Sequence, residues 1–301
     1  MWDCETGVAC ECSGLDKCNT PQCELSRAGL NGIGNMSLTD VLRLWYTNVN
    51  EYSKLKLRLS NERLPALSGP AGWISRRISR LTNDGQYLAG LWRHNLARGL
   101  LWQVGLHEHH YDGFTPTGIY RRHTYQAPTW SWASHPGPIS YAPNVIRELV
   151  QRTDFKVLAT CREIEGAKVF GKVSSSHIIC RGALLSVRIR IKCQRYSEVF
   201  FQIEELGCSL ANDINTAAVF SPDVDFHPHE PDCLNRKKTL YALLVASSES
   251  KIHGLVLEQL DTTSDNYTRL SHFETSTLSL FELLDSHPTQ LRDRVKTIKI
   301  L

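Results

Sequence analysis

The stretch APTWSWASHPGPISY, residues 127–141, separates two parts of the chain that differ in composition. Trp130 and Trp132 alternate with Ser131, and all seven tryptophans of the chain lie at or before Trp132. In an extended strand, Trp130 and Trp132 would point to the same side. That side could be an aromatic platform for a ligand, or it could pack against another part of the protein.

Burial favours the second alternative. Two buried indoles remove a large apolar area from water, which stabilises a fold by about 5 kcal/mol or more. Two further tryptophans lie in an apolar segment upstream. We therefore predict a structural clamp between the two parts of the chain, formed by Trp92, Trp102, Trp130 and Trp132. The flanking prolines fit an expected strand that lies at the edge of a sheet, or a strand with the prolines at its ends.

The residues before this stretch have helical spacing of apolar side chains. A helix capped by Ser37 or Thr39 is expected within residues 37–63, where apolar and charged residues interleave. Residues 64–80 start with a Pro-Gly break and can continue into another helix. Residues 81–104 are expected to form two short helical segments that pack through their tryptophans.

After Trp132 the pattern changes to short segments rich in β-branched residues, separated by Gly, Ser, Asp and Pro. The expected strands are residues 157–159, 177–181, 184–191, 199–203, 240–246, 255–260 and 295–301. One helical pattern, residues 278–284, interrupts them. Several short strands with turn signals between them are typical of a barrel or a sandwich.

These patterns predict an α+β fold, with an N-terminal mostly helical part followed by an antiparallel β-rich domain, barrel- or sandwich-like. The expected division has three parts. Residues 1–35 are a Cys-rich loop segment, residues 36–126 are a Trp-rich helical region, and residues 127–301 are the β-rich C-terminal domain.

Bulk composition narrows the class of protein. The chain has 301 residues, of which 42% are hydrophobic and 22% charged, as in a globular protein with a sizeable core. The net charge of +3 is mild and the Lys and Arg residues are scattered, so no nucleic-acid partner is expected. No apolar run is long enough to cross a bilayer and no secretory signal is evident. We expect a cytoplasmic protein without a membrane partner.

The first candidate for metal binding is a cluster of five cysteines: Cys4, Cys10, Cys12, Cys18 and Cys23. Structural zinc sites usually take their ligands from paired short spacings such as CxxC. The cluster has no such pair and no nearby histidine, so reduced loop thiols are favoured over a zinc site.

Two polar clusters could also supply metal ligands. The first is His107, His109, His110 and Asp112, and the second is His229, Glu230, Asp232 and Cys233. Turn-forming residues surround both clusters, which favours solvated loops.

Nucleophile and nucleotide motifs are missing from the sequence. There is no GxSxG, no GxGxxG and no GxxxxGK[ST]. No catalytic residue, no resident metal and no cofactor is predicted, and we expect a protein that is not an enzyme. The enzymatic alternative is a metal-dependent hydrolase that uses His107, His109 and His229.

Several segments together carry a family resemblance. DGQYLAGLWRHNLARGLLW (residues 84–102) and YQAPTWSWASHPGPISY (residues 125–141) resemble the region that follows the HET domain in fungal heterokaryon-incompatibility (HET) domain proteins. LSNERLPALSGPA (residues 59–71) and WDCETGVACEC (residues 2–12) are similar to further segments of that region. Weaker strand matches extend the resemblance over nearly the whole chain.

The motifs of the HET domain itself are absent from these 301 residues. The chain is therefore expected to be a fragment, a truncated gene product or a stand-alone relic. The resemblance implies a non-enzymatic accessory or regulatory region, with a role in fungal non-self recognition and programmed cell death.

The implied partner is a HET domain in cis or in trans, or another protein. Plausible contacts are Trp2, Cys4, Leu44, Trp45 and Trp73. One alternative is a stand-alone interaction module that binds a protein through an exposed edge strand. Because HET domains are thought to resemble TIR modules, the resemblance also implies a second, enzymatic alternative, a nucleotide-processing module with TIR-like chemistry.

Overall fold

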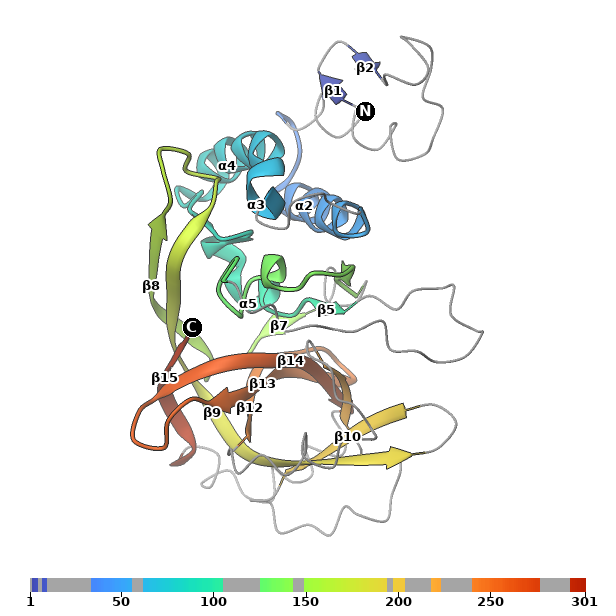
Figure 1. Ribbon diagram of the computed structural model, residues 1–301, viewed down its shortest axis with the longest axis vertical. Helices are drawn as coiled ribbons and strands as arrows, with labels where there is room; N and C mark the ends of the chain where they lie inside the picture. The colour runs from blue at the N-terminus through green and yellow to red at the C-terminus, as the bar shows by residue number, and fades with distance from the viewer. Residues whose placement is uncertain are drawn as a thin grey trace.

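The computed structural model describes residues 2–4, 7–9, 34–55, 62–104, 125–142, 149–193, 197–203, 218–222, 240–276 and 293–301. Helices lie toward one end of the molecule and a large sheet lies toward the other, with the tryptophan-rich segments between them (Figure 1). Near the N-terminus, β1 (Trp2–Cys4) pairs antiparallel with β2 (Gly7–Ala9), where a loop was expected.

Three helices follow, where the apolar spacing predicts two, one within residues 37–63 and one in residues 64–80. Helix α2 (Leu38–Ser53) begins after Ser37, whose side chain accepts a hydrogen bond from the Asp40 amide at 3.2 Å. A short helix, α3 (Arg63–Ala66), precedes α4 (Ser68–Thr82), which ends at Asn83 in the left-handed conformation. The apolar faces of α2 and α4 are buried in the core, which is how most helices in proteins gain their stability.

The segment 81–104 differs from the prediction of two short helices. Its first half is a hairpin of β3 (Tyr87–Leu88) and β4 (Leu91–Trp92). Ala89 and Gly90 between these strands both have positive φ, as a tight two-residue hairpin turn requires. The turn therefore overrides the helical spacing of the apolar residues.

The second half of this segment contains two consecutive short helical elements. The 3-10 helix η2 (Arg93–Asn95) leads into α5 (Leu96–Gly99). β5 (Gln103–Val104) then pairs antiparallel with β6 (Ile139–Ser140), which joins the segment to the end of the stretch 127–141.

A nine-stranded sheet makes up most of the remaining described chain. Its strands are β7 (Val150–Gln151), β8 (Lys156–Ile164), β9 (Val173–Cys193), β10 (Ser197–Ile203), β11 (Ala218–Pro222), β12 (Leu240–Ser247), β13 (Lys251–Gln259), β14 (Asn266–Ser276) and β15 (Val295–Ile300). The pairings are antiparallel except for β14 with β15, which is parallel. The expected α+β class with an antiparallel β-rich part is therefore confirmed.

Six of these strands close into a ring. The second half of β9 pairs with β10 on one side and with β12 on the other. Pairing then continues from β10 to β11, β14, β13 and back to β12. The first half of β9 leaves the ring and pairs with β8 and β15. Figure 1 shows this three-stranded arm running from the ring toward α4.

Strand β9 is longer than the sequence indicates. Residues 177–181 and 184–191 were expected as two strands, with Gly182 as part of the break between them. In the structure the ladder continues through Gly182, where an added Cβ would lie 2.9 Å from Leu243 and 3.2 Å from the Phe155 ring. A glycine is required here because the Leu243 and Phe155 side chains pack closely over the backbone. Glycines inside strands often mark such close approaches.

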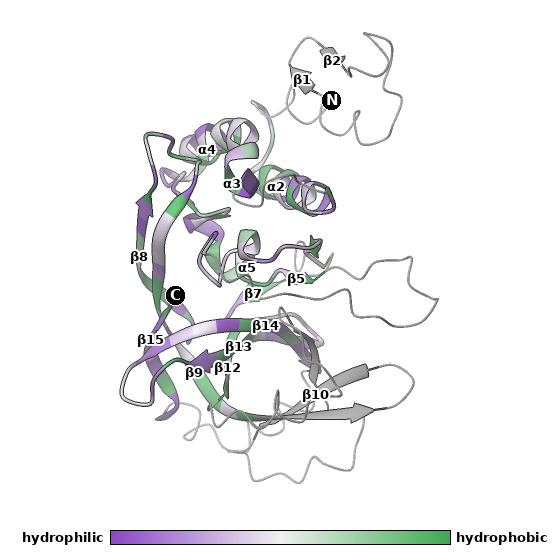
Figure 2. Ribbon diagram, in the orientation of Figure 1, coloured by the Kyte–Doolittle hydropathy of each residue, from purple (hydrophilic) through white to green (hydrophobic). Residues whose placement is uncertain are grey.

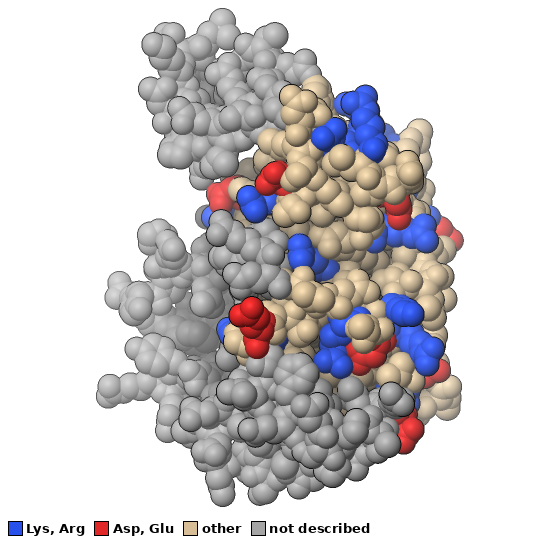
Figure 3. Space-filling model, turned by 180° about the vertical axis from the view of Figure 1, so that it is seen from behind, with Lys and Arg blue, Asp and Glu red and all other residues tan. Residues whose placement is uncertain are grey.

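One hydrophobic core connects the two parts of the molecule. Its buried residues extend from α2 and α4 through the tryptophan-rich segments to β9, β12 and β13. Apolar residues follow β12 and β13 along this core (Figure 2), and Lys and Arg side chains lie on the outside over α4 and along the arm (Figure 3). Among the described residues, no helix combines the length and the apolar character that a bilayer crossing needs.

Gly254 in β13 provides a test of this packing. An alanine there would place its Cβ 2.2 Å from the Leu243 carbonyl oxygen and 2.6 Å from the Phe273 ring. We expect Gly254→Ala to lower the free energy of unfolding by about 1–3 kcal/mol, because backbone must move to relieve the clash. Urea denaturation measures the change.

The matched control is Gly69→Ala in α4, where an added Cβ meets nothing within 4 Å. The same chemical change should there be neutral or stabilising by up to about 1 kcal/mol. Equal effects at the two positions would contradict the packing described for Gly254.

Candidate functional site

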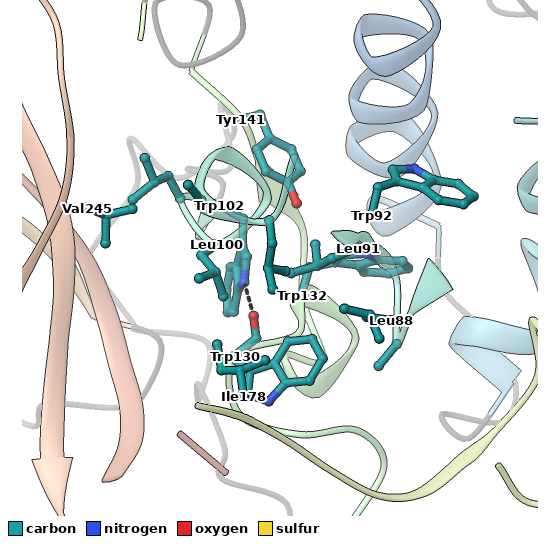
Figure 4. Packing of buried hydrophobic residues seen from close by; sticks show 14 of the residues in the cluster. Leu88, Leu91, Trp92, Leu100, Trp102, Trp130, Trp132, Tyr141, Ile178 and Val245 are labelled. Carbon is teal, nitrogen blue, oxygen red and sulfur yellow. Dashed lines mark hydrogen bonds between the residues drawn. The ribbon is translucent and has the colours of Figure 1, made fainter. Parts of the chain in front are cut away.

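Trp130 and Trp132 lie in a turn that leads into the 3-10 helix η3 (Trp132–Ser134), so the expectation of a strand through them is wrong. Ser131 ends the extended backbone, and its Oγ accepts a hydrogen bond from the Ala133 amide at 3.1 Å. Serine competes with regular strand pairing in this way because its side chain reaches its own backbone. The two indoles consequently do not share one side (Figure 4).

Gly90 is the meeting point of two tryptophans from distant segments. The indole nitrogens of Trp45 and Trp132 both donate to the Gly90 carbonyl oxygen, at 3.1 and 3.0 Å. Gly90 has φ +96°, and an added Cβ would lie 2.4 Å from Nε1 of Trp132. The position therefore requires glycine for its conformation and for the space that the indole occupies.

The remaining clamp residues contribute in different ways. Trp92 packs edge-on against Trp45 and Tyr87, with ring centroids 5.3 and 5.1 Å apart. Neither Trp92 nor Trp130 has a hydrogen-bond partner for its indole nitrogen within the described part of the chain. All four clamp tryptophans are at most 2% exposed, so Trp92 and Trp130 act through packing.

Trp102 connects the tryptophan region to the ring. Its indole nitrogen donates to the Trp130 carbonyl oxygen at 3.0 Å, and the Arg269 guanidinium of β14 lies 3.5 Å from the centroid of its ring. Arg269 also donates to the carbonyl oxygens of Leu100 and Trp102, at 2.6 and 2.5 Å. The guanidinium is buried, and its planar fork suits two carbonyls and an aromatic face together.

Thr129 makes a second connection beside Arg269. Its hydroxyl accepts from the Arg269 amide at 3.1 Å and donates to the Leu301 carbonyl oxygen. The Thr129 amide donates to the same oxygen at 3.1 Å, and the Leu301 amide donates to Tyr267 at 2.9 Å. One threonine thus joins the tryptophan stretch to β14 and to the residue after β15.

The tip of the arm contacts the helical end of the molecule. The Arg162 guanidinium of β8 donates to the Tyr87 carbonyl oxygen and, at 3.1 Å, to that of Val169. Phe170 packs edge-on against the Tyr87 ring, with centroids 5.3 Å apart, and lies beside Gly72 of α4. The two parts of the molecule therefore meet at the tryptophans and at the arm.

Arg63 and His135 complete the polar contacts around Trp132. Arg63 donates to the carbonyl oxygens of Pro136 and Gly137, at 2.6 and 3.1 Å. His135 accepts from the Gly137 amide at 3.2 Å. Burial lowers the pKa of His135 to about 4, and repulsion from the guanidinium of Arg63 adds to this effect. His135 is therefore neutral in the folded protein at neutral pH.

A second buried polar group lies on β13 and β14. His253 and His272 stack with their planes 20° apart, and Nδ1 of the first lies 3.2 Å from Nε2 of the second. Glu274 lies 3.9 Å from Nδ1 of His253 and binds the Lys251 ammonium. Burial is the main cause that lowers the pKa of both histidines. Neutral rings can share one N–H between them, whereas two imidazolium ions could not.

Most residues that the sequence analysis proposed as metal ligands lie outside the described residues. This holds for Cys10, Cys12, Cys18 and Cys23 and for both polar clusters. The expected helix at residues 278–284 also lies outside the described residues. Cys4 belongs to β1. Where residues are described, no three or more His, Cys, Asp or Glu side chains are grouped so that they could hold a metal ion.

The expected contacts with a partner also need a correction. Trp45 is fully buried and bonded to Gly90, so it cannot contact another protein. Leu44 and Trp73 are partly exposed at the edge of the core. Trp2 and Cys4 belong to β1.

Comparison with known proteins gives no relative: no family model, no curated protein and no solved structure matches this chain. The fold defines an α+β protein in which Trp92, Trp102, Trp130 and Trp132 connect the helices to the strand ring. We call this connection, together with Gly90 and Arg269, the junction. The resemblance to HET-domain proteins remains a prediction from the sequence.

Arg269 is the residue whose loss should disturb this junction most. In Arg269→Met, the buried carbonyls of Leu100 and Trp102 lose their donor. Since an unsatisfied buried acceptor costs about 1–3 kcal/mol, we expect the free energy of unfolding to fall by about 3 kcal/mol. Arg43→Met in α2 is the control, because its ion pair with Asp40 is exposed and should contribute less than about 1 kcal/mol. A similar small loss for both variants would contradict the role of Arg269.

The lowered pKa of His135 predicts that the stability of the fold depends on pH. In the unfolded chain it takes up a proton near pH 6.5, whereas its pKa in the fold is about 4. The unfolded state binds more protons between these values. The contribution of His135 to the free energy of unfolding is therefore fully present above about pH 6.5. It falls as the pH drops toward about 4, by up to about 1.4 kcal/mol per pH unit.

Urea denaturation across this pH range tests the prediction. His135→Asn keeps an acceptor for the Gly137 amide and should flatten the dependence, while the same change at the exposed His94 serves as the control. An unchanged slope in His135→Asn would show that other groups control the acid sensitivity.

Proposed function

We propose that this chain is a non-enzymatic accessory or regulatory region that works with a HET-type domain through protein contacts. The role implied by the resemblance is in fungal non-self recognition and programmed cell death. The proposed location is the cytoplasm.

The observation that supports the proposal is where the segments carrying the resemblance lie. Arg63 of the LSNERLPALSGPA segment binds the carbonyls of Pro136 and Gly137 in the tryptophan stretch. Gly90 of the YLAGLW segment accepts from Trp132 of the same stretch. Three segments far apart in the sequence therefore converge on one buried junction.

The role of these segments at the junction bears on function. The tryptophans of these segments are buried in the core, and Arg63 binds two backbone carbonyls. What the resemblance describes is then a scaffold, and a scaffold supports function by presenting a surface to a partner. This favours an accessory or regulatory role over catalysis at the junction.

The surface proposed for the HET domain lies on α2 and α4. Trp73 is partly exposed, and the Arg76 guanidinium lies 5.3 Å from the centroid of its ring. Partly exposed tryptophans next to arginines are frequent sources of binding energy in protein interfaces. Leu44 of α2 is partly exposed as well.

Binding of the full chain to a separately purified HET domain from a fungal heterokaryon-incompatibility protein tests the proposal. We expect a complex by calorimetry, and Trp73→Ser should weaken it by about tenfold or more. Leu260→Ser is the control, because Leu260 is 41% exposed and follows β13, outside α2 and α4. Urea denaturation of both variants separates lost binding from lost folding.

A chain that does not bind the HET domain, or a Trp73→Ser variant that is folded and binds as well as the unchanged chain, would contradict the proposal. Metal analysis of the purified full-length chain tests the enzymatic alternative, since a metal-dependent hydrolase using His107, His109 and His229 requires stoichiometric zinc, iron or manganese.

A further inference from the structure

The arm formed by β8, β9 and β15 has an outer face that turns away from the core. On β9, His177, Ile179 and Arg181 lie on this face, whereas Ser176, Ile178 and Cys180 are buried. Side chains directly opposite in a ladder share a face. The pairing register therefore assigns every neighbour of these β9 residues to the same outer face.

Three basic side chains meet on this face. Lys156 of β8 lies directly opposite Arg181, and Thr297 of β15 lies opposite Arg181 on its other side. In the next row, Lys299 and Ala159 flank Ile179. Figure 3 shows Lys and Arg side chains along the side of the molecule that carries the arm.

This arrangement has a cost within the fold. Like charges directly opposite each other in adjacent strands are destabilising, and Lys156 opposite Arg181 is such a pair. Within the described chain, neither of them forms an ion pair, and nor does Lys299. The one carboxylate on the same face of β8 is Glu163, at the far end of the strand opposite Ser175.

The positive potential also affects a neighbouring side chain. The pKa of His177 is lowered, first by partial burial and then by repulsion from Lys299. Lys299 therefore acts on the space above the first half of β9, where Glu163 opposes its effect on His177.

We propose that this face binds an acidic segment of another polypeptide. Carboxylates on that segment would neutralise Lys156, Arg181 and Lys299, and so remove a repulsion that the chain alone leaves unbalanced. The inference rests on register and charge in the arm, and holds whether or not the chain works with a HET domain.

The residues between the charges favour a polypeptide over other anions. Ala159 and Ile179 lie between the basic side chains, and Leu158 beside them is 51% exposed. These suit a small apolar side chain between two acidic ones in an extended segment. The face has no Trp, Tyr or Phe on which bases could stack. Its large apolar side chains, Ile179 on the face and Leu158 beside it, are too few for the broad apolar face that lies in a lipid surface.

The test uses the full chain and a fluorescent peptide in which Glu residues alternate with Gly and Leu. We expect salt-sensitive binding by anisotropy, because exposed charges attract each other less as ionic strength rises. The triple variant Lys156→Glu, Arg181→Glu and Lys299→Glu should bind at least about tenfold more weakly. The matched control is Lys296→Glu on β15, which is exposed but does not lie on the outer face.

Folding of the variants is checked separately. Lys156→Glu alone places a carboxylate opposite Arg181, so its thermal midpoint should not fall, although its peptide binding should. A short DNA duplex and phosphatidylserine vesicles are measured alongside the peptide. The proposal is overturned if the peptide does not bind, if the triple variant binds it as well as Lys296→Glu does, or if only the DNA or the vesicles depend on these three residues.

Discussion

The Arg269 guanidinium is the interaction on which the rest of the structure depends. It leaves the ring from β14, stacks on Trp102 and binds two carbonyls at the end of α5. A buried charge is expensive unless it is paired with several hydrogen-bond partners. Here the partners come from another part of the chain, so the ring and the tryptophan region satisfy each other's polar groups. Without the other part, each would leave these polar groups without their protein partners.

The junction combines this polar contact with tight packing around Gly90. Two indoles share one carbonyl acceptor, and the backbone there adopts a conformation that side chains disfavour. Such a site tolerates little variation, because the same atoms satisfy hydrogen bonding, conformation and volume together. The scaffold proposed for partner binding is thus held by a few residues of demanding geometry, while its outer surfaces are free to differ.

Apolar periodicity predicts α2, α4 and most strands of the sheet, because in those elements one physical signal dominates. It fails for Tyr87 to Trp92, where a turn at Ala89 and Gly90 overrides helical spacing, and for Trp132, where Ser131 bends the chain. It also misses β14, whose two faces are both buried and include Arg269 and His272. Their burial depends on partners distant in the sequence, so no local pattern could have identified Arg269, His135 or the histidine pair.

Strand β9 runs through both the arm and the ring as 21 continuous residues. Since side chains alternate along a strand, a single inserted or deleted residue turns every later side chain to the opposite face. Such a change near Gly182 would turn the side chains of the ring half of β9 to the opposite face, while the side chains of the arm half kept their orientation. The two halves of β9 can therefore diverge by substitution, but their length is fixed jointly, and lineages that retain this architecture should differ in length in their loops.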